Sequence, residues 1–161
     1  MTVTVRRAKP EDRPLLVPLF VEMDEHYLGS AAEDAATLDL RLARWFEDNI
    51  NSILLIAIEG SRAIGCAAIT PLFPAGSAQT ALFVKELYVS DAARGSGVGT
   101  ALLRACAMEA DAIGASRLDL TSEANNPRAR AFYERLGAFD TGKTYLRWEP
   151  DDIKRLAQSG G

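Results

Sequence analysis

The sequence is poor in the residues that most catalytic nucleophiles, metal sites and disulfide frameworks require. It has two cysteines and one histidine in 161 residues. Cys66 and Cys106 lie in apolar stretches without metal-ligand spacing, so we interpret them as small buried side chains of a protein in a reducing compartment. Because His26 is the one histidine and no nucleophile elbow is present, we expect neither a Cys–His pair nor a bound metal.

Long apolar runs and an excess of positive charge are also missing. No run approaches the roughly 18 residues of a membrane span, and the N-terminus alternates like a strand without the apolar core of a signal peptide. Asp and Glu number 22 against 18 Lys and Arg, for a formal net charge of −4. This balance argues against a general nucleic-acid binder. We expect a cytoplasmic protein that binds neither membranes nor nucleic acids.

The sequence does contain the apolar residues and the periodicity of one mixed domain. A length of 161 residues with 48% hydrophobic side chains predicts a single domain over residues 1–157 and a frayed tail over 158–161. Periodicity and turn residues predict strands over 3–8, 53–59, 62–70, 81–89, 117–121, near 139 and over 144–148, and helices over 10–28, 38–46, 97–113 and 127–136. The order βααβββαβαββ predicts an α+β (mixed α/β) fold, with a mixed, mostly antiparallel sheet and helices on both faces.

A glycine-rich turn between a predicted strand and helix is the most informative segment. From Val98 onward apolar residues recur at i, i+3, i+4 and i+7, which places the glycines at the N-terminus of a helix. Its first N–H groups and the helix dipole favour an anion, and glycines at 95, 97 and 99 let a pyrophosphate approach the backbone. Arg94 could add charge-assisted hydrogen bonds. A turn that merely packs is the alternative.

Spacing separates this turn from two other phosphate motifs. No Gly-Lys-Ser/Thr follows, as a P-loop requires, and position 100 is Thr where the dinucleotide fingerprint requires Gly. The pattern R-x-x-G-x-G is met by Arg94, Gly97 and Gly99. Downstream, the pattern N-x-x-A-x-x-[FL]-Y-x-x-x-G is met by Asn126, Ala129, Phe132, Tyr133 and Gly137.

With both motifs in order, residues 81–139 resemble the GNAT superfamily of N-acetyltransferases. Glu86-Leu-Tyr-Val89 and Phe132-Tyr-Glu-Arg-Leu-Gly-Ala138 look nearest to the branch with diamine and thialysine acetyltransferases. That branch usually has two acids where this chain has Lys85-Glu86. The resemblance implies that the chain uses acetyl-CoA as co-substrate and no metal.

The resemblance also implies where acetyl-CoA lies. The strand over 81–89 is expected to splay from the parallel strand over 117–121, so that backbone groups of Leu87 and Val89 bond the pantetheine amides; both side chains can also be core. Residues 95–100 would hold the pyrophosphate. The residues expected at the cofactor are Leu87, Tyr88, Val89, Arg94, Gly95, Ser96, Gly97, Val98, Gly99, Thr100, Asn126, Ala129, Phe132 and Tyr133.

Tyr133 and Glu86 are the two candidate catalytic residues. Tyr133 is the candidate general acid, because its place in the second motif implies a phenol near the thioester sulfur; a buried core tyrosine is the alternative. Glu86 shares a strand face with Tyr88, opposite Lys85, Leu87 and Val89, and could accept the amine proton directly or through water. A surface glutamate is the alternative. Asn126 could cap the helix opened by Pro127 or bond the cofactor arm.

An acidic and aromatic set lies near the end of the first predicted helix. Carboxylates there would attract an ammonium group, although a solvated helix face is the preferred interpretation of any single member. The set comprises Glu22, Asp24, Glu25, His26 and Tyr27.

These residues predict direct acetyl transfer to a primary amine, with a small molecule as acceptor. Two alternatives stay open: acetylation of a protein lysine or N-terminus, and a non-catalytic module that senses acyl-CoA. The resemblance further implies a homodimer in which terminal strands such as residues 143–148 pair or exchange. The sequence itself shows an edge that needs covering.

Overall fold

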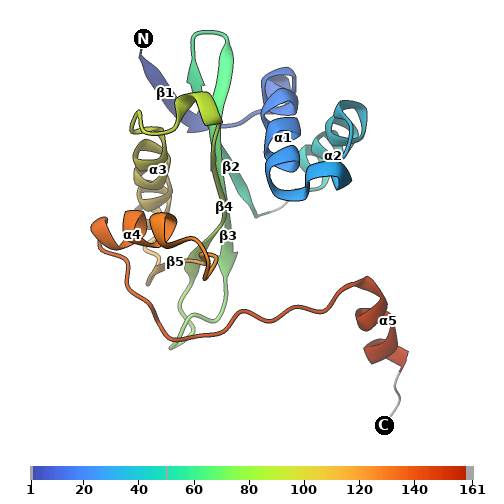
Figure 1. Ribbon diagram of the computed structural model, residues 1–161. Coiled ribbons are helices and arrows are strands. Elements are labelled where there is room, and N and C mark those ends of the chain that lie inside the picture. Colours follow the sequence, from blue (N-terminus) through green and yellow to red (C-terminus); the bar gives the residue numbers. More distant parts are fainter. Residues whose placement is uncertain (1, 50, 159–161) are drawn as a thin grey trace. The chain divides into compact units, whose positions relative to one another are not determined.

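The computed structural model describes residues 2–49 and 51–158. The chain divides into two compact units, Met1–Leu120 and Thr121–Gly161, which we describe separately. Figure 1 shows the order of their helices and strands. Gln158 ends a helix, and residues 159–161 of the predicted tail lie outside the described residues.

The first unit contains a five-stranded sheet in the order β1-β2-β3-β4-β5. Neighbours from β1 to β4 are antiparallel, whereas β4 and β5 are parallel. Its strands and longer helices are β1 (Val3–Arg7), α1 (Arg13–Leu28), α2 (Ala35–Asp48), β2 (Ile53–Glu59), β3 (Arg62–Leu72), β4 (Ala81–Val89), α3 (Val98–Ala112) and β5 (Leu118–Leu120). The single-turn helices are η1 (Pro10–Asp12), η2 (Gly29–Ala31) and η3 (Asp91–Ala93). The predicted class is confirmed, since the sheet is mixed and mostly antiparallel.

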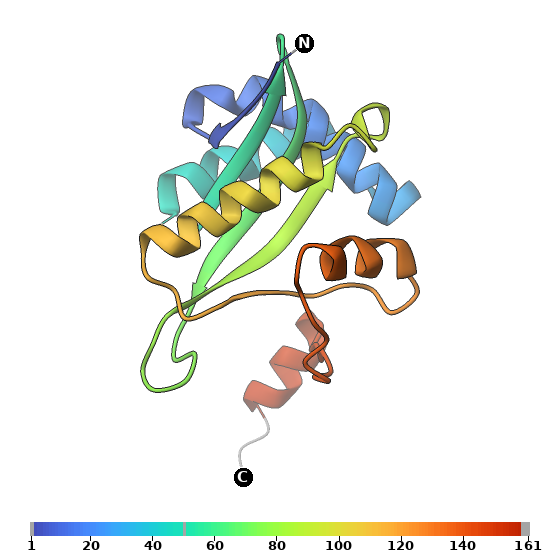
Figure 2. The ribbon, with the colours of Figure 1, turned by 90° about the vertical axis from the view of Figure 1, so that its left-hand side faces the viewer.

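Helices cover both faces of this sheet, as predicted. Figure 2 shows α3 across one face, with α1 and α2 behind the sheet. The α3 face buries Leu102 and Cys106, and the α1–α2 face buries Leu16 and Cys66. Both cysteines are fully buried and free, and burial raises the pKa of Cys106 to about 11 and that of Cys66 to about 12. The prediction that they are core side chains is confirmed.

A buried carboxylate fixes the start of α1 against the sheet. Asp12 accepts two hydrogen bonds from the Arg6 guanidinium, at 2.6 and 2.7 Å, and a third from the backbone N–H of Lys9 at 2.8 Å. The Arg6 hydrogen bonds hold the pKa of Asp12 below its ordinary value of 3.8. Because Arg6 belongs to β1, this contact sets the point from which α1 crosses the sheet.

Strand β4 contains a bulge that the sequence did not reveal. Its pairing with β3 runs from Glu86 opposite Ala68 directly to Val84 opposite Ile69, which leaves Lys85 without a β3 partner. One extra residue reverses the alternation of side chains. Leu82 and Val84 therefore share the α3 face with Leu87 and Val89. In a regular strand these even-numbered and odd-numbered residues would lie on opposite faces.

The second unit differs from the prediction after its first helix. Helix α4 (Pro127–Arg135) forms as expected, and Gly137 follows it with a φ of 97°, a conformation that favours glycine at a helix end. The strands predicted near Phe139 and over 144–148 are wrong in this structure: these residues form no strand, and α5 (Pro150–Gln158) follows them.

The predicted strands near Phe139 and over 144–148 do not form because they have no strand to pair with in the described part of their unit. A strand requires a neighbour for its backbone groups, and the described residues of the second unit, 121–158, form no strand that residues 138–149 could pair with. Phe139 and Leu146 are 80% and 75% exposed. Helix α5 was not predicted, although it carries ordinary helix signals: Pro150 at its start, Asp151 and Asp152 in its first turn and Arg155 in its last.

Gly65 of β3 sets the distance between α3 and the sheet. A Cβ atom at this position would lie 2.9 Å from the carbonyl oxygen of Tyr88 and 3.1 Å from side-chain atoms of both Val98 and Leu102. We expect Gly65→Ala to destabilise the fold by about 2 kcal/mol, because the first turn of α3 must move away from β3. Urea unfolding of the variant and the parent chain measures this difference. Equal stability would show that α3 is not packed this closely.

Candidate functional site

The C-terminal half of β4 has a strand neighbour on one side only. β3 pairs with β4 as far as Val89, whereas the parallel ladder with β5 covers only Leu82–Val84. Beyond Val84, no strand among residues 2–49 and 51–158 lies on the β5 side. The predicted splaying of the two parallel strands thus corresponds to an open edge of β4 along residues 85–89.

A glycine turn follows this open edge and begins α3. Gly95 and Gly97 have φ values of 81° and 89°, in the left-handed region that glycine adopts without strain. Gly97 is the N-cap of α3 and offers no side-chain acceptor, and the first helical hydrogen bond is that from Ala101 N–H to the Gly97 carbonyl, at 3.0 Å. The N–H groups of residues 98–100 therefore lack helical partners. No atom lies within 4 Å of a Cβ built on either glycine, so a phosphate can reach the backbone.

Arg94 lies beside this turn but contacts protein groups. Its guanidinium is 2.6 Å from the Asp91 carboxylate, and its Nε donates to the Val89 carbonyl at 3.1 Å. The guanidinium carbon also lies 5.7 Å from the centre of the Tyr88 ring. Arg94 thus closes the loop between β4 and the glycine turn, and its contact with a pyrophosphate stays a prediction.

Glu86 is held by two hydrogen bonds to the same carboxylate oxygen. Its Oε1 accepts from the Tyr27 hydroxyl at 3.2 Å and from the backbone N–H of Leu87 at 3.2 Å. Glu86 pairs with Ala68, whose side chain packs on the α1–α2 face. The predicted separation of Glu86 and Tyr88 from Leu87 is therefore confirmed. Glu86 is partly exposed, and its role as base stays a prediction.

Tyr88 links β4 to α1 through a second carboxylate. Its ring is 2% exposed, and its hydroxyl donates to Glu22 Oε1 at 3.1 Å. The same oxygen accepts from the backbone N–H of Asp91 at 2.8 Å. Burial, followed by the contact with Glu22, raises the pKa of Tyr88 above its ordinary value of 10. Glu22 therefore holds the loop that leads to the glycine turn.

The end of α1 adds two aromatic rings to this cluster. The rings of His26 and Tyr27 lie 5.0 Å apart, and they lie 6.0 and 6.2 Å from the Tyr88 ring. The solvated interpretation fits Glu25, His26 and Tyr27, which are exposed, whereas Glu22 is partly buried and accepts the Tyr88 hydrogen bond. The sequence carried no signal for these contacts, because residues 22 and 27 lie about 140° apart around an ideal helix and so do not mark one face.

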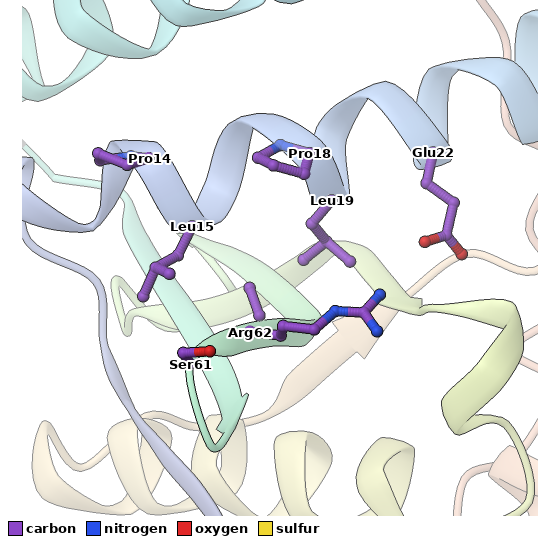
Figure 3. A pocket seen from close by; sticks show the side chains of 8 residues that line it. Pro14, Leu15, Pro18, Leu19, Glu22, Ser61 and Arg62 are labelled. Atoms are coloured by element: carbon purple, nitrogen blue, oxygen red, sulfur yellow. The ribbon is translucent and has the colours of Figure 1, made fainter.

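A shallow cavity of about 200 Å³ borders the same helix. It lies between α1 and the turn joining β2 to β3, and Figure 3 shows Pro14 at one end and Glu22 at the other. Its lining residues are Pro14, Leu15, Pro18, Leu19, Glu22, Ser61, Arg62 and Ala63. This volume is below that of typical ligand pockets.

The second motif belongs to the other unit. Asn126 caps α4, because its side chain accepts from the Ala129 N–H at 3.0 Å, which confirms the capping interpretation. Phe132 and Tyr133 lie on α4 with their rings 5.3 Å apart. The structure brings Glu86, the cluster at α1 and the glycine turn together within Met1–Leu120; the proposed cofactor contacts of residues 126–133 stay predictions.

Comparisons with known proteins identify the family of the chain. Residues 18–138 match the model of the Acetyltransferase (GNAT) family. The uncharacterized N-acetyltransferase YhfO of Bacillus subtilis (strain 168) is 34% identical over 141 residues, 87% of this chain and 93% of that protein. The integron cassette protein VCH_CASS6, from the mobile metagenome of V. cholerae, is 32% identical with a TM-score of 0.91, over 99% of both chains.

A more distant structure shares the fold. A transcriptional regulator from Bacillus halodurans C-125 has a TM-score of 0.77 at 24% identity, over 92% of this chain and 99% of that one. From the family model and the similarity to YhfO, the chain belongs to the GNAT family of acetyltransferases. That family uses acetyl-CoA as co-substrate. No helix among residues 2–49 and 51–158 is long and apolar enough to cross a membrane, and these residues contain no cluster of possible metal ligands.

The glycine turn can be tested against a matched glycine at the other end of α3. Gly97→Val places a β-branched side chain at a φ of 89° over the free N–H groups, so we expect acetyl-CoA affinity to fall more than tenfold. Gly114 also has a positive φ and open space around a Cβ, so Gly114→Val introduces similar strain away from the turn. Calorimetric titration of both variants separates the effects. Equal affinities in the two variants would contradict the assignment of the turn.

Proposed function

We propose that this chain transfers an acetyl group directly from acetyl-CoA to the primary amine of a small molecule. One observation carries the proposal: within one unit, the open edge of β4 leads directly to the glycine turn, and the Glu86 carboxylate is held on the same strand. A backbone edge, an anion site and a candidate base therefore follow one another over residues 85–100. This is the arrangement that a long, phosphate-bearing thioester and an amine would require.

The residues of this segment have separable roles in the proposed reaction. Backbone groups of residues 87–89 would bond the pantetheine amides, and the N–H groups of residues 98–100 would bind the pyrophosphate. The bound acetyl-CoA supplies the thioester carbonyl. Glu86 would accept a proton from the ammonium or amine of the acceptor, and Tyr133 would donate a proton to the departing thiolate. Both buried cysteines have raised pKa values, which supports direct transfer over a cysteine-bound intermediate.

The acceptor side of the proposal rests on the cluster at the end of α1. An amine is mostly protonated near neutral pH, and a carboxylate beside aromatic rings favours an ammonium group. Glu86, Tyr27 and His26 provide such surroundings on the α1–α2 face. We propose a small alkylamine, in keeping with the motif resemblance to the diamine and thialysine branch.

The first experiment measures acetyl-CoA binding by calorimetry and thiol release from the same samples with a panel of amines. Binding with release for putrescine, lysine or an aminoglycoside supports the proposal and identifies the acceptor class. Release with a peptide alone would favour a protein acetyltransferase. Binding without any release would favour a sensor, and absence of binding would overturn the proposal.

Tyr133 gives a direct test of the acid. We expect Tyr133→Phe to lower kcat about 100-fold, since the thiolate must leave without a proton donor, with little change in acetyl-CoA affinity. Tyr145→Phe, a change at a tyrosine that is 59% exposed in the same unit, serves as control. Steady-state kinetics and calorimetry check both quantities. An unchanged kcat in Tyr133→Phe excludes Tyr133 as the acid.

We also propose a homodimer in the cytoplasm. Two free, buried cysteines suit a reducing compartment. Residues 138–149 carry four exposed large apolar side chains and no regular structure, and a second copy is the partner we propose for them. These side chains are Phe139, Tyr145, Leu146 and Trp148.

The dimer can be tested by placing a charge in this segment. We expect the parent chain to have twice its 17.4 kDa mass in solution, and Trp148→Asp to be monomeric because a buried carboxylate opposes association. Met108→Asp is the control, since Met108 is a 72% exposed residue of α3. Light scattering after gel filtration gives the masses. A monomeric parent chain, or equal masses for both variants, argues against the proposed interface.

A further inference from the structure

Tyr27 forms a side-chain hydrogen bond to Glu86 that joins α1 to β4. Its hydroxyl donates to Oε1 of Glu86 at 3.2 Å, across 59 positions in sequence. The backbone N–H of Leu87 bonds the same oxygen. Both hydrogen bonds that residues 2–49 and 51–158 give this carboxylate therefore end on Oε1. Oε2 accepts no hydrogen bond from these residues.

Tyr27 is itself fixed at the end of α1. Its ring contacts His26 edge-on, with the centres 5.0 Å apart, and contacts Tyr88 at 6.2 Å. Tyr88 is buried and bonded to Glu22, which lies five residues before Tyr27 on α1. Glu22 and Tyr27 of α1 thus bond Tyr88 and Glu86 of β4. These two contacts fix the position of the helix along the strand. A lone tyrosine hydroxyl on a mobile helix end would not fix a carboxylate in this way.

We propose that Tyr27 is a positioning residue for the proposed acetyl transfer, acting through Glu86. The inference rests on the proposed function, because it assigns Glu86 the role of base. The Tyr27 hydroxyl holds Oε1 against the strand and thereby turns Oε2 toward the acceptor. Tyr27 touches no reacting atom in this proposal, so its removal changes the rate through the orientation of one carboxylate.

Orientation matters here because proton transfer requires a short and directed contact. A carboxylate side chain with three rotatable bonds loses most of its efficiency as a base when it samples several rotamers. The contact with Leu87 N–H alone leaves the carboxylate free to turn about that single hydrogen bond. The second hydrogen bond, from a residue on another element, removes this freedom.

The test uses Tyr27→Phe, which deletes the hydroxyl and keeps the ring that contacts His26 and Tyr88. We expect kcat to fall about tenfold with the amine identified by the panel, while acetyl-CoA affinity and the melting temperature stay near those of the parent. In a Glu86→Gln background the same substitution should have no further effect on kcat. An equal loss in both backgrounds would overturn the proposal, since Tyr27 would then act independently of Glu86.

A spectroscopic measurement decides the contact independently of turnover. With glutamate labelled with carbon-13 at the side-chain carboxyl, the Glu86 signal is the one that disappears in Glu86→Gln. We expect Tyr27→Phe to shift this signal and to leave that of Glu109, which is bound to Arg7, unchanged. An unmoved Glu86 signal overturns the inference even if the enzyme is active. If the parent protein transfers acetyl to no amine, the proposed function fails, and a role for Tyr27 in that reaction fails with it, whatever this signal shows.

Discussion

A single extra residue in β4 determines what each face of the sheet can hold. Because Lys85 has no β3 partner, the side chains before and after it change phase. Val84 and Leu87 both face α3 and close that core, while Glu86 and Tyr88 face α1. Without the bulge, a strand with apolar residues at 82, 84, 87 and 89 would bury one pair on each face. Because of the bulge, the four apolar residues lie on the α3 face, and Glu86 and Tyr88 lie on the α1–α2 face.

The two halves of the candidate site therefore depend on the same strand for different reasons. On one side, α3 packs against Gly65 and starts from a left-handed glycine, so that its free N–H groups follow the end of β4 directly. On the other side, α1 reaches β4 through the Glu22 and Tyr27 contacts. Glu22 also holds Asp91 in the loop between the halves. A displacement of α1 or α3 would therefore displace the other helix through β4 and that loop.

The sequence was sufficient wherever local periodicity and local chemistry coincide. The bounds of β4 were predicted to the residue, and α3 within a residue of each end, because apolar spacing and glycine punctuation agree there. The cap at Asn126 was equally readable. The Tyr27–Glu86 contact was not, since no rule of spacing relates a helix end to a strand 59 positions away. The segment over 144–148 has a strand pattern, yet a pattern cannot supply the neighbour that a strand requires.

The pairing of β1 with β2 has a consequence for how the chain folds. Val3 lies opposite Glu59, and both α1 and α2 are formed by the residues between the two strands. Joining them closes a long loop, whereas the meander from β2 to β4 joins neighbours in sequence. Contacts of high sequence separation form slowly, so the meander is expected to assemble first and β1 to add late. During synthesis the first strand to emerge would then be among the last to find its place.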